Sequence, residues 1–319
     1  MEETSLKAVV SEFMEEDILR DGLASWDIVY RPELVDDRQG LLDALAEADA
    51  LIVRNRTQVN AELLAHAPRL RVVGRLGVGL DNIDLAACKA AGVAVCPATG
   101  ANDVSVAEYV IGAAMVLLRG VFATPSRLAG GDWARNALMN GREIQGKRLG
   151  LVGFGSIARE TAARGLAMGM RVAAHDPFVA ADDPAWVTPL GRVELASLDQ
   201  IVGQSDVISL HVPLTDATRH LIGAKAIAAM KKDAILINAA RGGVVDESAL
   251  AQALAAGRLG GAALDVFETE PLPAGQAAGF ADLPNVILTP HIAGLSQESN
   301  RRVSEVTVAS VRAHLAGGA

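Results

Sequence analysis

The chain has 319 residues, of which 50% are hydrophobic and 21% are charged, an ordinary balance for a globular protein. This length suits two domains better than a single core. Its 29 Lys and Arg residues against 38 Asp and Glu residues give a formal net charge of −9, which argues against a nucleic-acid-binding surface.

Short apolar runs alternate with helical stretches rich in alanine and leucine along the whole chain. Such an alternation implies right-handed crossovers and mostly parallel sheets, as in α/β proteins. In the first hundred residues the pattern predicts helices at 40–48, 61–67 and 83–91 between strands at 7–10, 27–30, 50–53, 70–73 and 93–95. A second series of strands is predicted at 148–152, 171–174, 206–210, 234–237, 262–266 and 286–288.

Between the two series lie a long helical pattern at 102–119 and a polar stretch at 124–146. The polar stretch has too few apolar residues for a core element, yet Trp133, Leu138 and Met139 need to be buried somewhere. It is either an arm that packs on a partner chain or a surface excursion. We favour the arm, and therefore expect a homodimer.

The segment RLGLVGFGSIARETAARGLAMGMRVAAHDP has the layout of a dinucleotide-binding site. An apolar strand ends just before Gly153, a helix opens after Gly155, and the next strand ends at Asp176, 21 residues beyond Gly155. Gly153 permits the tight turn, and Gly155 lets the backbone approach a pyrophosphate held at the helix N-terminus. Ala158 stands in place of a third glycine, where helix and strand pack closely.

A glycine turn can also be needed for backbone geometry alone. Here strand, turn, helix, strand and terminal acid follow one another in order, which favours a cofactor site. Asp176 is expected to accept hydrogen bonds from the adenosine ribose and to repel a 2′-phosphate. The sequence therefore predicts NAD as the cofactor rather than NADP.

The motifs NAARGGVVDE, ALDVFETEPLP and LTPHIAG each begin at the end of a predicted strand. In doubly wound sheets ligands bind at that rim, so Arg241, Glu270 and His291 can converge there. Oxidation of a 2-hydroxy acid needs a base for the hydroxyl proton, and histidine suits that task near neutral pH. A carboxylate orients the ring and stabilises the imidazolium, while an arginine binds the substrate carboxylate bidentately.

Taken singly, each of these three residues has an ordinary alternative. His291 can be a strand-end residue, Glu270 a solvated loop acid and Arg241 a surface charge. Their common position after strands and downstream of a phosphate turn favours one catalytic site.

The chain resembles the D-isomer-specific 2-hydroxyacid dehydrogenases, and within them most closely the catalytic part of D-3-phosphoglycerate dehydrogenases. The resemblance runs from about residue 50 to residue 293. It rests on the motifs LIVRNRT, VVGRLGVGLDNIDL, NDVSVAEYV, LGLVGFGSIARE, HVPLT, NAARGGVVDE, ALDVFETEP and TPHIAG.

This resemblance implies two doubly wound parallel-sheet domains. A Rossmann NAD-binding domain, residues 99–291, is expected to be inserted into a flavodoxin-like substrate domain made of residues 1–98 and 292–319, with the active cleft between them. By the same resemblance Arg241 binds the substrate, Glu270 is the partner acid and His291 is the general acid/base.

The resemblance also carries over a set of binding positions. For NAD these are Gly153, Gly155, Ser156, Ile157, Asp176, Val212, Thr218, Ala239, Ala240, Arg241, Asp265, His291 and Gly294. For the substrate they are Arg54, Arg75, Gly77, Val78, Arg135 and Arg241, with the loop 75–80 presenting backbone N–H groups to the substrate carboxylate.

Arg54 and Arg75 favour a substrate with an anionic tail, such as phosphate, sulfonate or a second carboxylate, whereas Arg56 is interpreted as part of a solvated basic face. Val78 and Asp103 depart from the threonine and serine that phosphoglycerate dehydrogenases carry at these positions. An added acid would oppose a doubly charged phosphate. The expected substrate is therefore 3-phosphoglycerate-like or sulfolactate-like, with other short 2-hydroxy acids left open.

Two alternatives remain at this level. Transcriptional corepressors use the same fold with NAD as a ligand, so an NAD-binding protein without significant turnover is possible from the fold alone. Formate dehydrogenases share the architecture but carry glutamine at the position of Glu270, and the glutamate disfavours them. Turnover of a 2-oxo acid with NADH separates the first alternative from the dehydrogenase.

Cys88 and Cys96 are the two cysteines, and they lack the spacing of metal ligands, which predicts a reduced protein without a metal site. The N-terminal sequence lacks the layout of a signal peptide, and the apolar stretch around 110–118 is too short to span a bilayer. We expect a cytoplasmic protein whose partners are a small-molecule substrate and a second copy of the chain, with no nucleic acid and no membrane.

Overall fold

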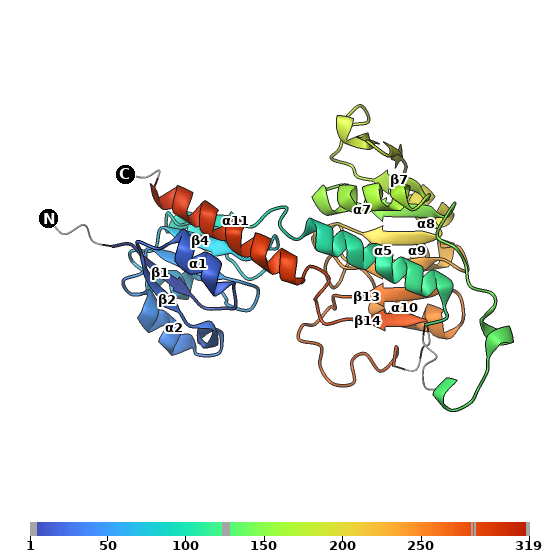
Figure 1. Cartoon of the computed structure of the whole chain (residues 1–319), viewed down its shortest axis with the longest axis horizontal. Coiled ribbons are helices and arrows are strands. Elements are labelled where there is room, and N and C mark those ends of the chain that lie inside the picture. The colour runs from blue at the N-terminus through green and yellow to red at the C-terminus, as the bar shows by residue number, and fades with distance from the viewer. Residues whose placement is uncertain (1–4, 123–127, 282, 284, 317–319) are drawn as a thin grey trace. The chain divides into compact units, whose positions relative to one another are not determined.

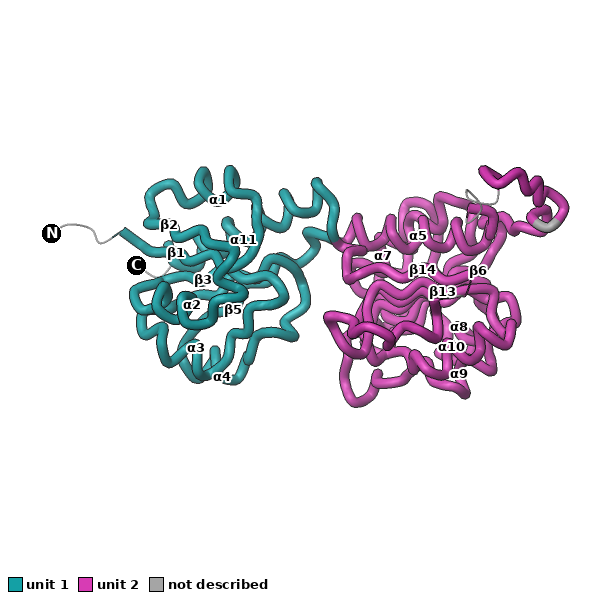
Figure 2. The backbone as a smooth tube through the Cα atoms, turned by 90° about the horizontal axis from the view of Figure 1, so that it is seen from below, with its two compact units in different colours: residues 1–102, 295–319 teal, residues 103–294 magenta. Residues whose placement is uncertain are grey.

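A computed structural model of the chain describes residues 5–122, 128–281, 283 and 285–316 (Figure 1). The chain divides into two compact units, shown in different colours in Figure 2. Unit 1 comprises residues 1–102 and 295–319, and unit 2 comprises residues 103–294. Unit 1 is thus built from both ends of the chain, and unit 2 is inserted between them. The boundaries expected from the sequence are 98 and 291.

Unit 1 is built on a five-stranded parallel sheet with the order β2-β1-β3-β4-β5. This is the strand order of flavodoxin-like doubly wound sheets. Its strands are β1 (Lys7–Val10), β2 (Asp27–Tyr30), β3 (Ala50–Val53), β4 (Val72–Arg75) and β5 (Ala94–Pro97). The central strand β3 is buried along its whole length, as expected where helices cover both faces.

Helices cover both faces of this sheet. The helices of unit 1 are α1 (Glu16–Gly22), η1 (Pro32–Val35), α2 (Arg38–Leu45), α3 (Ala61–Ala65), α4 (Leu85–Ala90) and α11 (Gln297–Ala316). Helices α2, α3 and α4 pack on one face, and their N-termini are capped by the side chains of Asp37, Asn60 and Asp84. Helices α1 and α11 pack on the other face, so the C-terminal segment completes the N-terminal unit.

Unit 2 is built on a seven-stranded parallel sheet with the order β10-β7-β6-β11-β12-β13-β14. Its first six strands follow the 3-2-1-4-5-6 order of a Rossmann fold, and β14 adds a seventh. The strands are β6 (Arg148–Val152), β7 (Arg171–His175), β10 (Glu194–Leu195), β11 (Val207–Leu210), β12 (Ile235–Asn238), β13 (Gly261–Leu264) and β14 (Val286–Leu288). A separate antiparallel pair is formed by β8 (Val187–Thr188) and β9 (Gly191–Arg192).

The two faces of this sheet bury two apolar clusters. The helices of unit 2 are α5 (Asp103–Arg119), η2 (Arg135–Leu138), α7 (Ser156–Ala167), η3 (Pro184–Trp186), α8 (Leu198–Gln204), α9 (Ala224–Ala229) and α10 (Glu247–Ala255). Helices α5 and α7 share one cluster with Val207, and α8, α9 and α10 share the other with Ile208 (Figure 1). Adjacent strand residues point to opposite faces and both faces are covered, which is why the central strands of this sheet are mainly apolar.

The predicted α/β fold with two doubly wound parallel sheets is confirmed. The strands predicted at 7–10, 27–30, 50–53, 148–152 and 286–288 coincide with those observed. The largest displacement is at β4, which begins two residues later than predicted because Leu70 still belongs to the turn after α3 and donates its N–H to Ala67. The two-residue strands β8, β9 and β10 are too short for a periodic signal and were not predicted.

The polar stretch between the two strand series contains the short helix η2 and helical residues at 128–129, and is otherwise irregular where it is described. Residues 124–127 of the expected arm lie outside the described residues. Trp133 is 79% exposed and Met139 is 73% exposed. These two apolar side chains, on which the arm prediction rests, are therefore not covered by the described residues of this chain.

None of the helices in the described ranges combines the length and apolar character needed to cross a membrane.

Candidate active site

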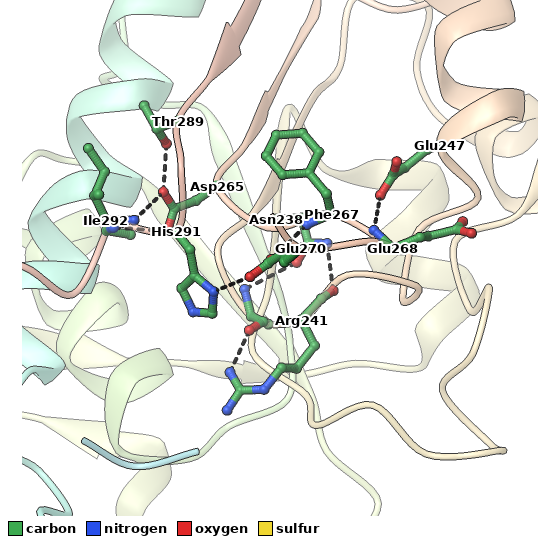
Figure 3. A network of polar contacts seen from close by, with 12 residues as sticks. Asn238, Arg241, Glu247, Asp265, Phe267, Glu268, Glu270, Thr289, His291 and Ile292 are labelled. Carbon is green, nitrogen blue, oxygen red and sulfur yellow. Dashed lines mark hydrogen bonds and ion pairs between the residues drawn. The ribbon is translucent and has the colours of Figure 1, made fainter. Parts of the chain in front are cut away.

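Three neighbouring parallel strands of unit 2 carry the residues with the most distinctive chemistry. Strands β12, β13 and β14 pair in sequence order and end at Asn238, Leu264 and Leu288. The loops that follow them bear Arg241, Glu270 and His291, which gather at one edge of the sheet (Figure 3). The predicted convergence of these loops is explained by the parallel register of their strands.

His291 and Glu270 form a hydrogen-bonded pair. His291 Nδ1 lies 2.6 Å from Glu270 Oε2, and Glu270 Oε1 accepts the N–H of Phe267 at 3.0 Å (Figure 3). Partial burial by itself raises the pKa of Glu270. The hydrogen bonds from His291 and Phe267 and the charges of His291 and Arg241 outweigh that effect and hold this pKa below its ordinary value.

The ionised carboxylate can only accept hydrogen bonds, so Nδ1 of His291 is the donor in this pair. This fixes the tautomer and leaves Nε2 as the ring atom that takes up or releases a proton. The His291 side chain is 41% exposed, so a reactant can reach it.

The backbone of His291 is held in an uncommon conformation. Its φ is 56°, in the left-handed region that costs a residue other than glycine about 1–2 kcal/mol. Asp265, which is almost completely buried, stabilises this conformation. Its carbonyl accepts the N–H of His291 at 2.7 Å, and its carboxylate accepts the N–H groups of Ile292 and Ala293, both at 2.8 Å.

A series of side-chain hydrogen bonds connects Asp265 to helix α5. Thr289 Oγ1 donates to Asp265 Oδ1 at 2.6 Å, and Tyr109 Oη lies 2.7 Å from Thr289 Oγ1. The family resemblance placed Asp265 among the positions expected to bind NAD. In the structure its carboxylate accepts three hydrogen bonds from the loop that carries His291, and that assignment stays a prediction.

Arg241 is held by the end of β12. Asn238 Nδ2 donates to the carbonyl of Arg241 at 2.9 Å, and Asn238 Oδ1 accepts the N–H of Ala240 at 3.1 Å. The guanidinium Nη1 donates to the carbonyl of Ala240 at 2.6 Å. The positive charge of Arg241 is also one of the causes that lower the pKa of Glu270, which places the two side chains in the same electrostatic environment.

The phosphate turn lies at the ends of β6 and β7. Gly153 has a φ of 91°, and a Cβ there would lie 2.5 Å from the carbonyl oxygen of His211. Glycine is therefore required at Gly153 by the chain itself. Gly155 differs, because its φ is not in the left-handed region and a Cβ there would meet nothing within 4 Å. No packing contact explains glycine at this position, whereas a closely approaching ligand does.

The turn opens α7 at Gly155, an N-cap residue without a side chain, so the first N–H groups of the helix, beginning with Ser156 and Ile157, receive no hydrogen bond from the N-cap side chain. Asp176 follows β7, where its Oδ2 accepts the N–H of Phe154 and its Oδ1 the N–H of Phe178, both at 2.8 Å. An uncapped helix start and an oriented acid fit the pyrophosphate and the adenosine ribose of NAD.

The remaining positions expected to bind cofactor lie on loops of the same sheet edge. Val212 follows β11, and its Cγ1 would lie 3.1 Å from a Cβ added at Gly153. Thr218 Oγ1 donates to the carbonyl of Pro213 at 2.6 Å and so closes its own loop. Ala239, Ala240 and Gly294 are partly exposed on the loops after β12 and β14.

Unit 1 holds most of the residues expected to bind substrate. Arg54 Nη2 donates to Asn300 Oδ1 at 2.7 Å, and its guanidinium lies 5.9 Å from the ring centre of Phe13. Arg75 Nη1 donates to the carbonyl of Leu76 at 2.7 Å. In the same loop Gly77 is buried and Val78 is 38% exposed.

Two other arginines have different surroundings. Arg56 forms an exposed ion pair with Asp36, in line with its interpretation as a surface charge. Arg135 opens the exposed helix η2, within the segment expected to form the arm. None of the contacts described for Arg135 tests its predicted binding of the substrate, which stays a prediction.

Sequence reasoning missed the residues that orient the site. Asn238 holds the Arg241 carbonyl through its side-chain amide. Phe267 holds Glu270 through its backbone N–H, and Thr289 holds Asp265, the anchor of the His291 loop, through its hydroxyl. Of these, Asn238 carried a signal, because it is a polar residue at the end of a buried strand. Within the described residues, no group of three or more His, Cys, Asp or Glu side chains is arranged to hold a metal ion.

Comparison with known proteins gives a consistent result. Residues 111–293 match the family model described as "D-isomer specific 2-hydroxyacid dehydrogenase, NAD binding domain". The chain is 53% identical to the (S)-sulfolactate dehydrogenase of Chromohalobacter salexigens over 304 residues, which cover 95% of this chain and 96% of that protein.

It is also 43% identical over 281 residues to the D-3-phosphoglycerate dehydrogenase of Mycobacterium tuberculosis, covering 88% of this chain and 52% of that protein. Among solved structures, the D-lactate dehydrogenase of Aquifex aeolicus, complexed with NAD and lactic acid, is similar with a TM-score of 0.82 and 32% identity. That match covers 98% of this chain and 96% of the other.

Proposed function

This chain belongs to the D-isomer specific 2-hydroxyacid dehydrogenase family, and on that premise we propose that its substrate is a short 2-hydroxy acid with an anionic tail. The chain is an NAD-dependent 2-hydroxyacid dehydrogenase of this family. The observation that carries the choice of catalytic residues is the 2.6 Å hydrogen bond between His291 and Glu270 beside Arg241.

The three residues divide the work. When bound, NAD supplies the acceptor for the hydrogen that leaves C2 of the hydroxy acid with its electron pair. Nε2 of neutral His291 takes the hydroxyl proton, and the Glu270 carboxylate stabilises the imidazolium that results. In the reverse reaction the protonated ring returns this proton to the oxygen of the 2-oxo acid.

Arg241 binds the substrate carboxylate. Its planar guanidinium can donate two parallel hydrogen bonds, which restrain rotation of the acid and select one face of C2. Asn238 supports this positioning, because its Nδ2 donates a hydrogen bond to the backbone carbonyl of Arg241 at 2.9 Å. Positioning of this kind lowers the entropic part of the barrier and acts on both binding and rate.

A sulfonate tail is the form of substrate that we favour. Support comes from the 53% identity with an (S)-sulfolactate dehydrogenase and from Arg54 and Arg75 in unit 1, which we propose contact the tail. A sulfonate carries a single negative charge, so Asp103, buried at the start of α5, opposes it less than it opposes a phosphate dianion.

The (S) label does not conflict with the D-specific family. In sulfolactate the CH2 bearing sulfur outranks the carboxylate in the naming rules, whereas in lactate the carboxylate outranks the methyl group. The same spatial arrangement at C2 is therefore named (S) in sulfolactate and (R), or D, in lactate. One geometry of Arg241 and His291 serves both acids.

The experiment is a panel of 2-oxo acids reduced with NADH: sulfopyruvate, phosphohydroxypyruvate, hydroxypyruvate, glyoxylate and pyruvate. The proposal expects the highest kcat/KM with sulfopyruvate and a marked loss with the tail-less pyruvate and glyoxylate. An Arg54→Met variant should lose that preference while retaining activity on glyoxylate. A preference for acids without a charged tail would contradict the proposed substrate class.

We also propose that the enzyme is a homodimer joined through residues 102–146, and that it is located in the cytoplasm. The exposed Trp133 and Met139 support the first proposal, and the two free cysteines, Cys88 and Cys96, support the second.

A further inference from the structure

A second histidine–carboxylate pair lies beside the candidate active site and has no role in the chemistry described above. His220 Nε2 lies 3.0 Å from Glu268 Oε1, and Glu268 is two residues before Glu270. Glu247 Oε1 accepts the N–H of Glu268 at 2.6 Å (Figure 3). We refer to His220, Glu247 and Glu268 as the Glu268 clamp.

The clamp joins three separate segments of unit 2. His220 lies on the loop before α9, and its own N–H donates to the carbonyl of Gly243 at 2.7 Å. Glu247 is the first residue of α10, directly after the loop that carries Arg241. Glu268 lies on the loop after β13 that carries Glu270. The clamp thus connects two of the three loops that bear the proposed catalytic residues.

Backbone packing reinforces this connection at one peptide group. A Cβ on Gly242 would lie 1.8 Å from the carbonyl oxygen of Phe267, so the Arg241 loop touches the peptide between Phe267 and Glu268. The carbonyl of that peptide faces Gly242, and its N–H is held by Glu247. The N–H of Phe267 in turn donates to Glu270 Oε1 at 3.0 Å. The Phe267 N–H belongs to the preceding peptide group, so the residue that holds Glu270 lies directly next to a peptide group that is held by contacts with both Gly242 and Glu247.

His220 lies beside a group of three carboxylates that act on one another. Burial raises the pKa of Glu247, and the charges of Glu268 and Glu270 raise it further, whereas the hydrogen bond from the Glu268 N–H and the charge of His220 lower it. Three carboxylates close enough to act on one another are stabilised by hydrogen-bond donors and cations nearby. His220 faces Glu268, while His291 and Arg241 act on Glu270.

We propose that His220, Glu247 and Glu268 are positioning residues that hold the Glu270 carboxylate in place against His291. The inference rests on the proposed function, in which Glu270 stabilises protonated His291. None of the three clamp residues needs to touch the substrate. Their effect on catalysis passes through Glu270 and therefore disappears when Glu270 no longer carries a charge.

The test is a double-mutant cycle with His220→Asn and Glu270→Gln. Asparagine is chosen because His220 has a φ of 49°, a conformation that asparagine tolerates, and because its side chain is too short to reach Glu268. In the otherwise unchanged enzyme His220→Asn should lower kcat by about three- to tenfold and leave the KM for NADH within about twofold. In the Glu270→Gln background its effect should fall below about twofold.

Glu268→Gln, which removes the charge but keeps the shape, should repeat this pattern if His220→Asn fails to fold. Glu194→Gln is the matched control, since Glu194 is a half-exposed carboxylate of the same unit in an ion pair with Arg148, at the first residue of β6. The control should leave kcat unchanged. Equal losses of kcat in both Glu270 backgrounds, or no loss in either, would overturn the proposal.

A measurement without turnover separates this proposal from the proposed function. The short His291–Glu270 hydrogen bond should give a downfield imidazole N–H proton signal that is absent in Glu270→Gln. His220→Asn should shift or broaden that signal, and Glu194→Gln should not. Inactivity of the wild-type enzyme on every 2-oxo acid would contradict the proposed function alone. An unchanged imidazole signal in His220→Asn would contradict the clamp alone.

Discussion

At the scale of single residues, His291 depends on neighbours that hold its ring and its backbone separately. Glu270 orients the ring at 2.6 Å, and Asp265 stabilises the left-handed backbone through its carbonyl and carboxylate. Sequence motifs predicted His291 and Glu270 as site residues, because histidine is suited to proton transfer near neutral pH and a carboxylate stabilises the imidazolium. The anchoring role of Asp265 could not be predicted, since hydrogen bonds to backbone N–H groups depend on the folded loop and leave no pattern in the sequence.

Replacement of Glu270 with glutamine should change the pH dependence of activity. The pKa of Glu270 is held below its ordinary value of 4.5, so the carboxylate is ionised throughout the neutral and mildly acidic range. Without that charge the His291 ring holds its proton less tightly. The acidic limb of kcat/KM for 2-hydroxy acid oxidation should extend to lower pH, and 2-oxo acid reduction should weaken at neutral pH and above.

Full pH–rate profiles in both directions test this prediction, with Glu194→Gln as the control for loss of a carboxylate elsewhere in unit 2. Identical profiles for Glu270→Gln and the wild type would mean that Glu270 does not partner His291.

Asp176 should determine the choice of cofactor. Its carboxylate is oriented by the N–H groups of Phe154 and Phe178 and would face the 2′-phosphate of NADP at close range. The kcat/KM for NADH should exceed that for NADPH by about tenfold or more. Asp176→Asn should narrow the gap. Comparable efficiency with both cofactors in the wild type would refute the assignment.

At the scale of elements, the sequence located the strands well and the loops poorly. Parallel strands such as β3 and β11 are buried along their whole length and mainly apolar, so they stand out between helical stretches. The parallel register of β12, β13 and β14 then brings the three loops that bear the proposed catalytic residues to one edge of the sheet. The Glu268 clamp was not predicted, because His220, Glu247 and Glu268 come together through contacts between loops rather than through any periodic pattern.

The two glycines of the phosphate turn should fail in different ways when changed to alanine. Gly153→Ala introduces a Cβ 2.5 Å from the carbonyl oxygen of His211 at a φ of 91°. Strain and overpacking together should cost about 2–4 kcal/mol and lower the Tm by about 4–16 °C. Gly155→Ala meets no atom of the chain within 4 Å, so its Tm should be nearly unchanged.

Gly155→Ala should instead raise the Kd of NADH by about tenfold, because the backbone can no longer approach the pyrophosphate closely. Differential scanning fluorimetry and NADH fluorescence titration measure the two effects on the same samples. A large loss of Tm in Gly155→Ala with an unchanged Kd would show that this glycine serves packing rather than the cofactor.

At the scale of the whole molecule, the two ends of the chain together form unit 1, and unit 2 is the segment inserted between them in the sequence. Composition and periodicity alone did not indicate that arrangement, because they report local structure and not which segments share a core. The resemblance to a family supplied it. Helix α11 packs through Val303, Val308 and Val311 on the same sheet face as α1, a long-range contact that no local pattern encodes.

The exposed apolar side chains of residues 128–139 should be buried in a homodimer. Trp133 and Met139 are more than two-thirds exposed, which is unfavourable for large apolar side chains in water. Sedimentation at micromolar concentration should give twice the mass of one chain. Trp133→Asp combined with Met139→Asp should give the mass of a single chain, with NADH binding retained. A wild-type enzyme that sediments as a monomer would contradict the dimer.

The proposed substrate and mechanism are tested most directly by the initial rate of NADH formation from the two enantiomers of sulfolactate with NAD. The rate is measured in the wild type and in His291→Ala. We expect turnover of the (S) enantiomer and at least about 100-fold slower turnover of the (R) enantiomer. We also expect His291→Ala to lower kcat by about 10²–10⁴-fold with little change in NADH binding. Equal rates for both enantiomers, or a His291→Ala enzyme as fast as the wild type, would contradict the proposed substrate and mechanism.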